Sequence, residues 1–268
     1  MHMEAIPSAI EAFEEILSVL GPSKPVVFLD FDGTLAPIVP TPDQARMSDA
    51  MHQRVEALSR LCTTAVISGR GLPDVQRRVG IESIAYAGSH GFEIRTAGGE
   101  IVEHGAQFLP ELERAESELR LRLGELEGVI VERKKFSIAV HYRQVAAHDM
   151  PRVKKCVDQV LSEFQGIRAI AGKKIFDLQP AMEWHKGRAV RWLRGALEFP
   201  KEKHGSGPPT PLYIGDDTTD EDAFEEIRED GVGIVVQESP APSAARYRLR
   251  NTDEVEAFLG LLIEALKS

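Results

Sequence analysis

The segment VVFLDFDGTLAPIV, residues 26–39, decides the fold and indicates the chemistry of this chain. Its apolar start is typical of a buried strand, and two carboxylates, Asp30 and Asp32, follow where that strand ends. Residues two apart on an extended chain share a face, so both acids can meet one substrate. One carboxylate can attack phosphorus while the other protonates the leaving oxygen and later activates water. The pattern predicts phosphoryl chemistry; a polar strand end with a glycine turn is the simpler alternative.

Composition limits the class of protein. The 268 residues are 43% hydrophobic, which is enough for one large domain or two modest ones with real cores. Cys62 and Cys156 have no patterned spacing, so we expect buried, reduced thiols and a cytoplasmic setting. The start, MHMEAIPSAIEAFEEILSVL, carries acids through its apolar part, unlike a signal peptide, and no window is apolar enough to span a membrane.

The charge distribution points to a small anionic partner. A formal net charge of -10 argues against nucleic acid binding, which requires excess Lys and Arg. Residues 132–174 nevertheless contain ten Lys or Arg against four Asp or Glu, a local balance of +6. That segment could face an anionic ligand or be a solvated basic face. We expect a monomer, although the sequence does not define the oligomeric state.

Apolar runs alternate with amphipathic stretches along the outer parts of the chain. The predicted strands are residues 25–29, 63–67, 84–87, 211–214 and 232–236. Residues 48–61 and 253–267 are predicted helices. Strands that alternate with helices favour a doubly wound, parallel, Rossmann-like sheet of the α/β class.

The middle of the chain has a different pattern. Residues 111–126 and 151–164 favour helices, whereas 136–143 and 174–180 favour strands, the former with antiparallel alternation. We interpret this block as an inserted α+β subdomain. The predicted division is a core of residues 1–107 and 180–268, with an insert of residues 108–179.

Polar residues follow each predicted strand of the core, where ligands bind in an open parallel sheet. They are Asp30 and Asp32; Ser68, Gly69 and Arg70; Ser89, His90 and Gly91; and Gly215, Asp216, Asp217 and Asp220. Five carboxylates at one edge would repel one another unless a cation neutralised them. Mg²⁺ is the expected cation, because it prefers oxygen ligands and substrate phosphates.

We expect Asp30 and Asp216 to bind Mg²⁺ directly, the Asp32 backbone carbonyl to be a third ligand, and Asp217 or Asp220 to act through water. The transferred phosphoryl group also needs donors for its oxygens. Candidate donors are Ser68, which could equally cap a helix, and Lys186, which starts a predicted helix after the insert.

In order and spacing, four segments resemble the motifs of the haloacid dehalogenase-like hydrolases. They are DFDGT at 30–34, ISGR at 67–70, Lys186 and GDDTTDEDAF at 215–224. Within that superfamily the chain resembles the trehalose-6-phosphate phosphatases, through GSHGFEIR at 88–95, ERKKFSIAVHYR at 132–143 and MEWHKG at 182–187. The resemblance covers nearly the whole chain. It implies a catalytic core, with the insert as a cap that closes over the sugar.

The resemblance also implies a set of substrate-binding residues: Glu132, Lys134, Arg143 and Glu183 in the cap or hinge, and Arg70, Ser89, His90 and Gly91 below them. Continuous strand alternation from residue 132 would put Glu132 and Lys134 opposite Arg143. We therefore expect both in a turn that precedes the strand. His185 occupies a position where the family more often has Asp or Asn, so its role is open.

Three hypotheses follow. The leading one is an Mg²⁺-dependent phosphatase that releases trehalose through an aspartyl-phosphate. A sibling would act on another sugar phosphate, such as sucrose 6-phosphate or a glucosylglycerol-type phosphate, because cap residues can change without the four motifs. A catalytically silent sugar-phosphate sensor is disfavoured by Asp32, since a binder needs no acid or base there. A P-type transport ATPase is excluded, because Asp rather than Thr lies two residues after Asp30.

Overall fold

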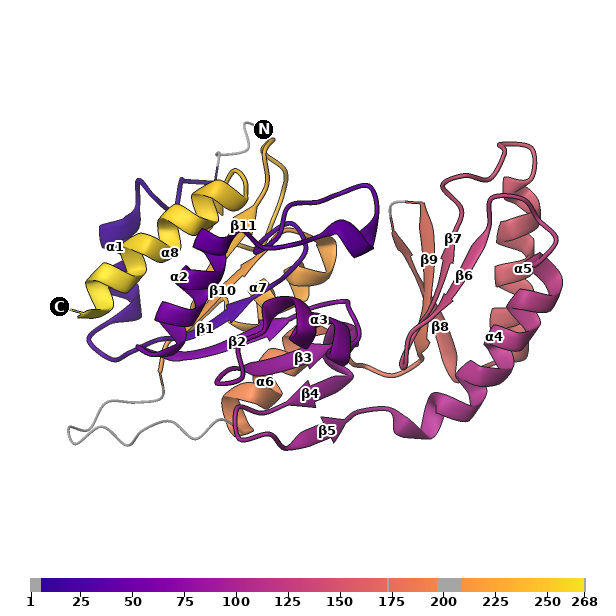
Figure 1. The fold of residues 1–268 in the computed structure, drawn as a ribbon, viewed down its shortest axis with the longest axis horizontal. Coiled ribbons are helices and arrows are strands. Elements are labelled where there is room, and N and C mark those ends of the chain that lie inside the picture. The colour runs from indigo at the N-terminus through magenta and orange to yellow at the C-terminus, as the bar shows by residue number, and fades with distance from the viewer. Residues whose placement is uncertain (1–5, 173, 197–208, 268) are drawn as a thin grey trace. The chain divides into compact units, whose positions relative to one another are not determined.

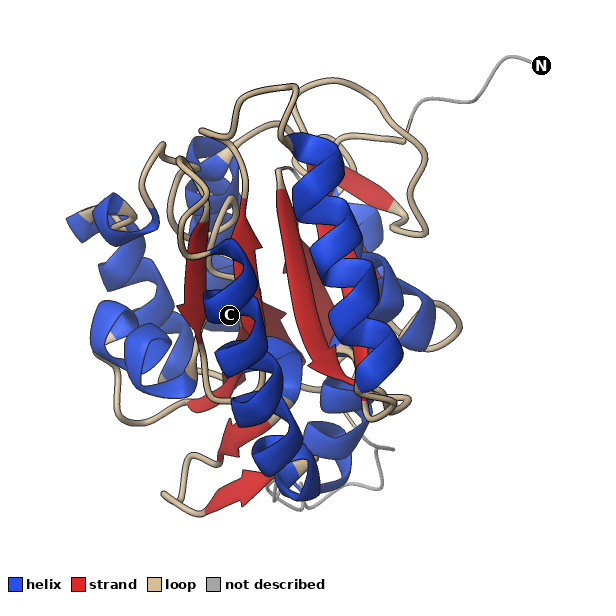
Figure 2. Ribbon diagram, turned by 90° about the vertical axis from the view of Figure 1, so that its right-hand side faces the viewer, coloured by secondary structure: helices blue, strands red, loops and turns tan. Residues whose placement is uncertain are grey.

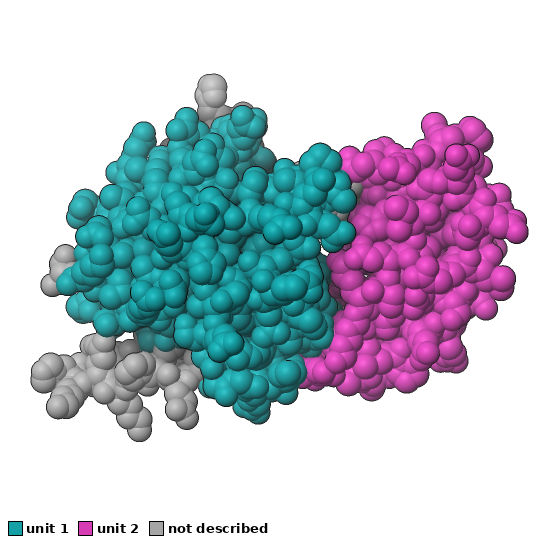
Figure 3. Space-filling model, viewed as in Figure 1, with its two compact units in different colours: residues 1–102, 184–268 teal, residues 103–183 magenta. Residues whose placement is uncertain are grey.

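The computed structural model describes residues 6–172, 174–196 and 209–267. The chain forms two compact units, unit 1 of residues 1–102 and 184–268 and unit 2 of residues 103–183 (Figure 3). Unit 2 extends beyond the predicted insert at both ends. Glu103 pairs with Lys135, and the amide of Ala181 donates to the Gly166 carbonyl at 2.7 Å. These contacts attach both flanking segments to unit 2.

Within the described residues, unit 1 is built on an eight-stranded sheet in the order β12-β11-β10-β1-β2-β3-β4-β5 (Figure 1). Its strands are β1 (Val26–Leu29), β2 (Thr63–Ile67), β3 (Ala85–Gly88), β4 (Glu93–Arg95), β5 (Ile101–Glu103), β10 (Pro211–Gly215), β11 (Val232–Val236) and β12 (Tyr247–Leu249). Pairing is parallel from β12 to β3, and β4 is antiparallel to β3. The predicted α/β fold with a parallel sheet is confirmed.

Helices cover both faces of this sheet. They are α1 (Phe13–Leu20), α2 (Asp49–Ser59), α3 (Leu72–Val79) and α8 (Thr252–Lys267) on one face, and α6 (Lys186–Ala196) and α7 (Glu221–Glu226) on the other. Short 3₁₀ turns are η1 (Pro42–Gln44), η2 (Ser89–Gly91) and η4 (Thr218–Asp220). The burial of β1 on both sides explains its unbroken apolar run, since Val27 and Leu29 join one core and Val26 and Phe28 the other.

Unit 2 has two layers, a sheet and a helix pair (Figure 2). Its sheet has the order β6-β7-β9-β8 and is antiparallel throughout. The elements are η3 (Ala106–Phe108), α4 (Leu109–Leu123), β6 (Ile130–Arg133), β7 (Ile138–His141), α5 (Met150–Glu163), β8 (Ile167–Gly172) and β9 (Ile175–Pro180). Helices α4 and α5 share one apolar core with Ile138, Val140 and Leu178.

The expected turn before residue 136 is half right. Lys134 lies in it, since its amide donates to the Ser137 carbonyl at 2.8 Å. Glu132 does not, because it belongs to β6 and pairs with Ala139 of β7. Paired residues share a face, so the hairpin reverses the parity that a continuous strand would give. Glu132 therefore lies on the same face as His141, away from α4 and α5.

Two further expectations concern the setting of the chain. Cys62 and Cys156 are both buried and free, as expected, and burial raises the pKa of the Cys62 thiol to about 12. Among the described residues, none of the helices has the length and apolar character needed to cross a membrane.

Candidate active site

The ammonium group of Lys186 joins two segments that are distant in the sequence. Lys186 is the first residue of α6, and its Nζ donates to Asp30 Oδ1 and to Asp220 Oδ1, each at 2.7 Å. Asp30 follows β1, and its amide donates to the Ile214 carbonyl of β10 at 2.9 Å. All three side chains are at least 95% buried. The predicted positions at the strand ends are thus brought into one cluster.

Burial and charge act strongly on this cluster. Burial raises the pKa of Asp30 well above its usual range, and Lys186 only partly offsets this because Asp220 and Asp216 also raise it. Burial alone would lower the pKa of Lys186, but the two carboxylates outweigh it and raise that pKa. Lys186 therefore stays charged, and the acids around it exceed the positive charge that it supplies.

Asp220 is buried and fully engaged with donors. Its Oδ1 accepts from the Tyr213 hydroxyl at 2.5 Å as well as from Lys186. Its Oδ2 accepts from the amides of Asp216 and Asp217 at 3.2 and 3.0 Å. Asp217 is exposed and caps η4, where its Oδ1 accepts from the Thr218 amide at 2.7 Å. Asp220 thus fixes the loop after β10, and Asp217 takes part in that turn.

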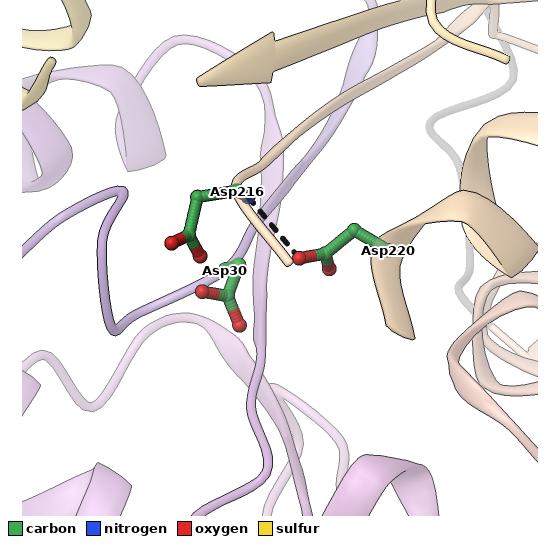
Figure 4. A group of neighbouring side chains, drawn as sticks. All are labelled: Asp30, Asp216 and Asp220. Carbon is green, nitrogen blue, oxygen red and sulfur yellow. Dashed lines mark hydrogen bonds between the residues drawn. The ribbon is translucent and has the colours of Figure 1, made fainter. Parts of the chain in front are cut away.

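Asp216 completes a group of three carboxylates with Asp30 and Asp220, and oxygens of these three side chains lie within 4.8 Å of one another (Figure 4). Burial and the charge of Asp220 raise the pKa of Asp216 to about 7, although Lys186 partly offsets this increase. Gly33 has φ +82, and a Cβ there would overlap the Asp216 carboxylate. The glycine of the DFDGT motif therefore makes room for an acid from another strand.

Asp32 is held by an arginine. Arg70 Nε and Nη2 donate to Asp32 Oδ2 and Oδ1 at 2.7 and 2.6 Å, and its Nη1 donates to Asp74 Oδ2 of α3 at 3.0 Å. The backbone carbonyl of Arg70 accepts from the Ser89 amide at 2.6 Å. Arg70, which the resemblance implies as a substrate-binding residue, contacts Asp32 and Asp74 in this structure.

Ser68 lies at the end of β2 and is buried, and its Oγ accepts from the Arg70 amide at 3.1 Å. It is not the cap of α3, which is Gly71. The Ser68 carbonyl accepts from the His90 amide at 2.9 Å. Ser89, His90 and Gly91 all have positive φ, and the Ser89 hydroxyl donates to buried Glu93 at 3.0 Å. Two predicted clusters are thus tied together by backbone hydrogen bonds.

The remaining predicted residues belong to unit 2. Glu132 is exposed and its Oε2 lies 2.8 Å from His141 Nε2. This hydrogen bond lowers the pKa of Glu132, and Lys134 lowers it further. Arg143 lies in the turn after β7, and Glu183 is exposed at the end of the unit. Glu132 and Lys134 therefore belong to one hairpin.

Some functional candidates were missed from the sequence. Tyr213 has the appearance of a core residue in an apolar run, and no spacing distinguishes it. Asp74 could have been found, because it follows Arg70 by four residues, the spacing at which opposite charges pair along a helix. His185, whose role the sequence leaves open, has its Nδ1 3.6 Å from Asp222 Oδ2 in α7.

Solved structures define the class of fold. A trehalose-6-phosphate phosphatase C-terminal domain from C. albicans aligns with a TM-score of 0.79 at 24% identity, over 98% of this chain and 99% of that one. A haloacid dehalogenase-like hydrolase from Bacteroides thetaiotaomicron aligns with a TM-score of 0.63 at 14% identity, over 91% of this chain and 99% of that one. The fold is that of the haloacid dehalogenase-like hydrolases, as predicted.

Sequence comparison gives the family. Residues 28–253 match the trehalose-phosphatase family model. The probable trehalose-phosphate phosphatase D of Arabidopsis thaliana is 37% identical over 96% of this chain and 72% of its own length. The trehalose-phosphate phosphatase of Mycobacterium ulcerans is 37% identical over 100% of this chain and 68% of its own. The chain belongs to the trehalose-phosphatase family and is a phosphatase.

The raised pKa of Asp216 predicts a pH effect on stability in metal-free buffer. The folded pKa of about 7 lies above the ordinary value of 3.8, so the folded protein keeps a proton that the unfolded chain releases between these values. This contribution is complete below pH 3.8 and is lost as the pH rises through about 7. With EDTA, the parent should lose about 2–3 kcal/mol relative to Asp216→Asn between pH 5 and pH 8. Urea unfolding measures this, and parallel pH curves for the two proteins would contradict it.

Proposed function

We propose that this phosphatase hydrolyses trehalose 6-phosphate to trehalose and phosphate, with Asp30 as nucleophile and Asp32 as general acid and base. The observation that carries the proposal is the buried bridge from Lys186 to Asp30 and Asp220, next to Asp32 on the same strand end. Membership of the trehalose-phosphatase family supports the substrate.

The first half-reaction forms a bond between an Asp30 carboxylate oxygen and phosphorus. The bond from phosphorus to the sugar oxygen breaks, and that oxygen takes the proton of Asp32, so trehalose leaves. In the second half-reaction water attacks phosphorus and gives a proton to Asp32. The Asp30–phosphorus bond breaks, phosphate leaves, and both carboxyl groups return to their starting forms.

Lys186 and Ser68 would stabilise the phosphoryl oxygens. An ammonium group has three N–H donors, and within the described residues two of them serve Asp30 and Asp220. The third can meet a phosphoryl oxygen without breaking the bridge. Ser68 is held rigidly at the end of β2 by backbone hydrogen bonds at Ser68 and Arg70. Fixed donors of this kind are the main source of catalysis in phosphoryl transfer.

The carboxylate group of Asp30, Asp216 and Asp220 fits a divalent cation. Its side chains offer only oxygen ligands, it is rich in acid, and burial together with the neighbouring carboxylates raises the pKa values of Asp30 and Asp216. Asp30 and Asp216 would hold Mg²⁺ directly, with the Asp32 carbonyl as a third ligand. Asp220 would act through water, because four donors already engage it. When bound, Mg²⁺ supplies charge that neutralises and orients the phosphate.

Unit 2 would read the sugar. It contains the basic segment of the chain and the hairpin that presents Glu132 and Lys134. Arg143 and Glu183 complete the proposed set. Charged groups that pair with sugar hydroxyls can reject ligands that lack those hydroxyls. Such a ligand would leave the charged groups buried and unpaired, at a cost of about 1–3 kcal/mol each. Unit 2 would thus act as the cap for specificity and unit 1 as the catalytic core.

A phosphate-release panel tests the proposal. We expect trehalose 6-phosphate to be the best substrate among trehalose, sucrose, glucose and glucosylglycerol phosphates, with turnover that requires Mg²⁺ and is lost in EDTA. Asp30→Asn should remove turnover almost entirely while the protein stays folded. Asp230→Asn, an exposed acid paired with Arg194, is the control and should match the parent. A folded Asp30→Asn enzyme with substantial turnover would rule out the covalent route, and preference for another sugar phosphate would rule out the substrate.

Calorimetric titration with Mg²⁺ tests the ligand assignment. Asp216→Asn should weaken Mg²⁺ binding by roughly 10-fold or more, because it removes a direct carboxylate ligand. Asp217→Asn is the matched control on the adjacent residue, whose exposed carboxylate caps η4, and it should weaken binding much less. Equal affinities of both variants and the parent would show that the assignment is wrong.

A further inference from the structure

The guanidinium of Arg70 lies between two carboxylates and uses a different edge for each. Nε and Nη2 donate to the two oxygens of Asp32 at 2.7 and 2.6 Å, and Nη1 donates to Asp74 Oδ2 at 3.0 Å. A paired contact of this kind fixes the plane of a carboxylate as well as its distance. Arg70 thus defines how the Asp32 carboxyl group is turned.

Arg70 is itself held in place. Asp74 on α3 also accepts from Arg78 Nε at 2.8 Å, and Arg78 Nη1 donates to the Ala45 carbonyl at 2.8 Å. The Phe31 ring centroid lies 5.4 Å from Arg70 Cζ. The side chains of Arg70 and Arg78 are each only 11% exposed. A connected series of ion pairs, ending in a hydrogen bond to the Ala45 carbonyl, therefore runs from Asp32 along α3 to the segment before α2.

The charges of this series support one another. Burial alone would lower the pKa of Arg70, but its hydrogen bonds to Asp32 and Asp74 outweigh burial and raise it. Burial alone would raise the pKa of Asp74, but hydrogen bonds from Arg78 and Arg70 outweigh burial and lower it. Cation and anion thus alternate along the series, and half-buried ion pairs are screened less by salt than exposed ones.

We propose that Arg70 is a positioning residue that acts through Asp32, and that Asp74 keeps Arg70 in place. The inference rests on the proposed function, since it assigns Asp32 the proton transfers of both half-reactions. A direct sugar or phosphate contact by Arg70, as the family resemblance implies, is the competing role.

A double-mutant cycle separates the two roles. Arg70→Lys keeps the charge but cannot form the paired contact. In the parent it should lower kcat for trehalose 6-phosphate on the order of 10- to 100-fold, a part of the 10²- to 10⁴-fold effect of a general acid and base. In Asp32→Asn it should cost no more than about 3-fold further, because no acid remains to be oriented. The first step of aryl phosphate cleavage, measured as the burst of released phenolate, hardly needs the proton and should fall less than sugar-phosphate cleavage.

A second variant tests whether Asp74 keeps Arg70 in place, and it leaves both Arg70 and Asp32 unchanged. Asp74→Asn should lower kcat for trehalose 6-phosphate roughly 3- to 10-fold, with the same sparing of aryl phosphates. Glu56→Gln is the matched control. It is an acid-to-amide change on α2, in an exposed pair with Arg60, the residue that follows the helix, and it should match the parent.

The outcomes are distinct. Equal losses from Arg70→Lys in the two backgrounds, or a raised KM at unchanged kcat, would overturn the positioning role and leave the proposed function standing. A folded parent that cleaves no phosphate monoester would overturn both. Thermal unfolding of each variant identifies a loss of fold, in which case the Asp74→Asn result decides.

Discussion

The bridge from Lys186 to Asp30 and Asp220 is the interaction on which the rest of the site depends. It joins the end of β1, the loop after β10 and the first residue of α6, all within the buried interior of unit 1. Removing one member of such a group would leave uncompensated buried charge, which is far more costly than the pair itself is stabilising. The positions of the side chains at the strand ends therefore depend on this ionic bridge, whereas the sheet that carries them is held by apolar packing.

The two units separate their roles in physical terms. Unit 1 has apolar cores on both faces of one sheet, so its polar residues are confined to strand ends, where positions are precise. Unit 2 has one core on one face of its sheet, so Glu132 and His141 lie on the face away from α4 and α5. Arg70 adds a constraint inside unit 1. It links Asp32 to Asp74 of α3, and its paired hydrogen bonds fix the plane of the Asp32 carboxyl group.

The sequence predicted the scaffold and the acids of the candidate site because both follow from local patterns. Apolar runs with carboxylates at their ends suffice for β1 and β10, and hence for Asp30 and Asp216. The pairing of Arg70 with Asp32 could not be predicted, since it depends on how β2 and α3 are placed beside β1. The role of Tyr213 could not be predicted, because in the sequence a tyrosine that donates a buried hydrogen bond looks the same as any aromatic residue of the core. Glu132 was misplaced because only a continuous strand or a turn was considered, and a hairpin, which reverses the parity, was not.

Coupling between Lys186 and Asp30 tests the central claim most directly. We expect Lys186→Met to cost about 3–5 kcal/mol of unfolding free energy in EDTA at pH 8, because it leaves buried carboxylates without their cation. Asp30→Asn should be destabilising in the parent but should recover stability in Lys186→Met, since there it removes an orphaned charge. Urea unfolding of the parent, both single variants and the double variant gives the coupling. Losses that add to within about 0.5 kcal/mol would contradict the account.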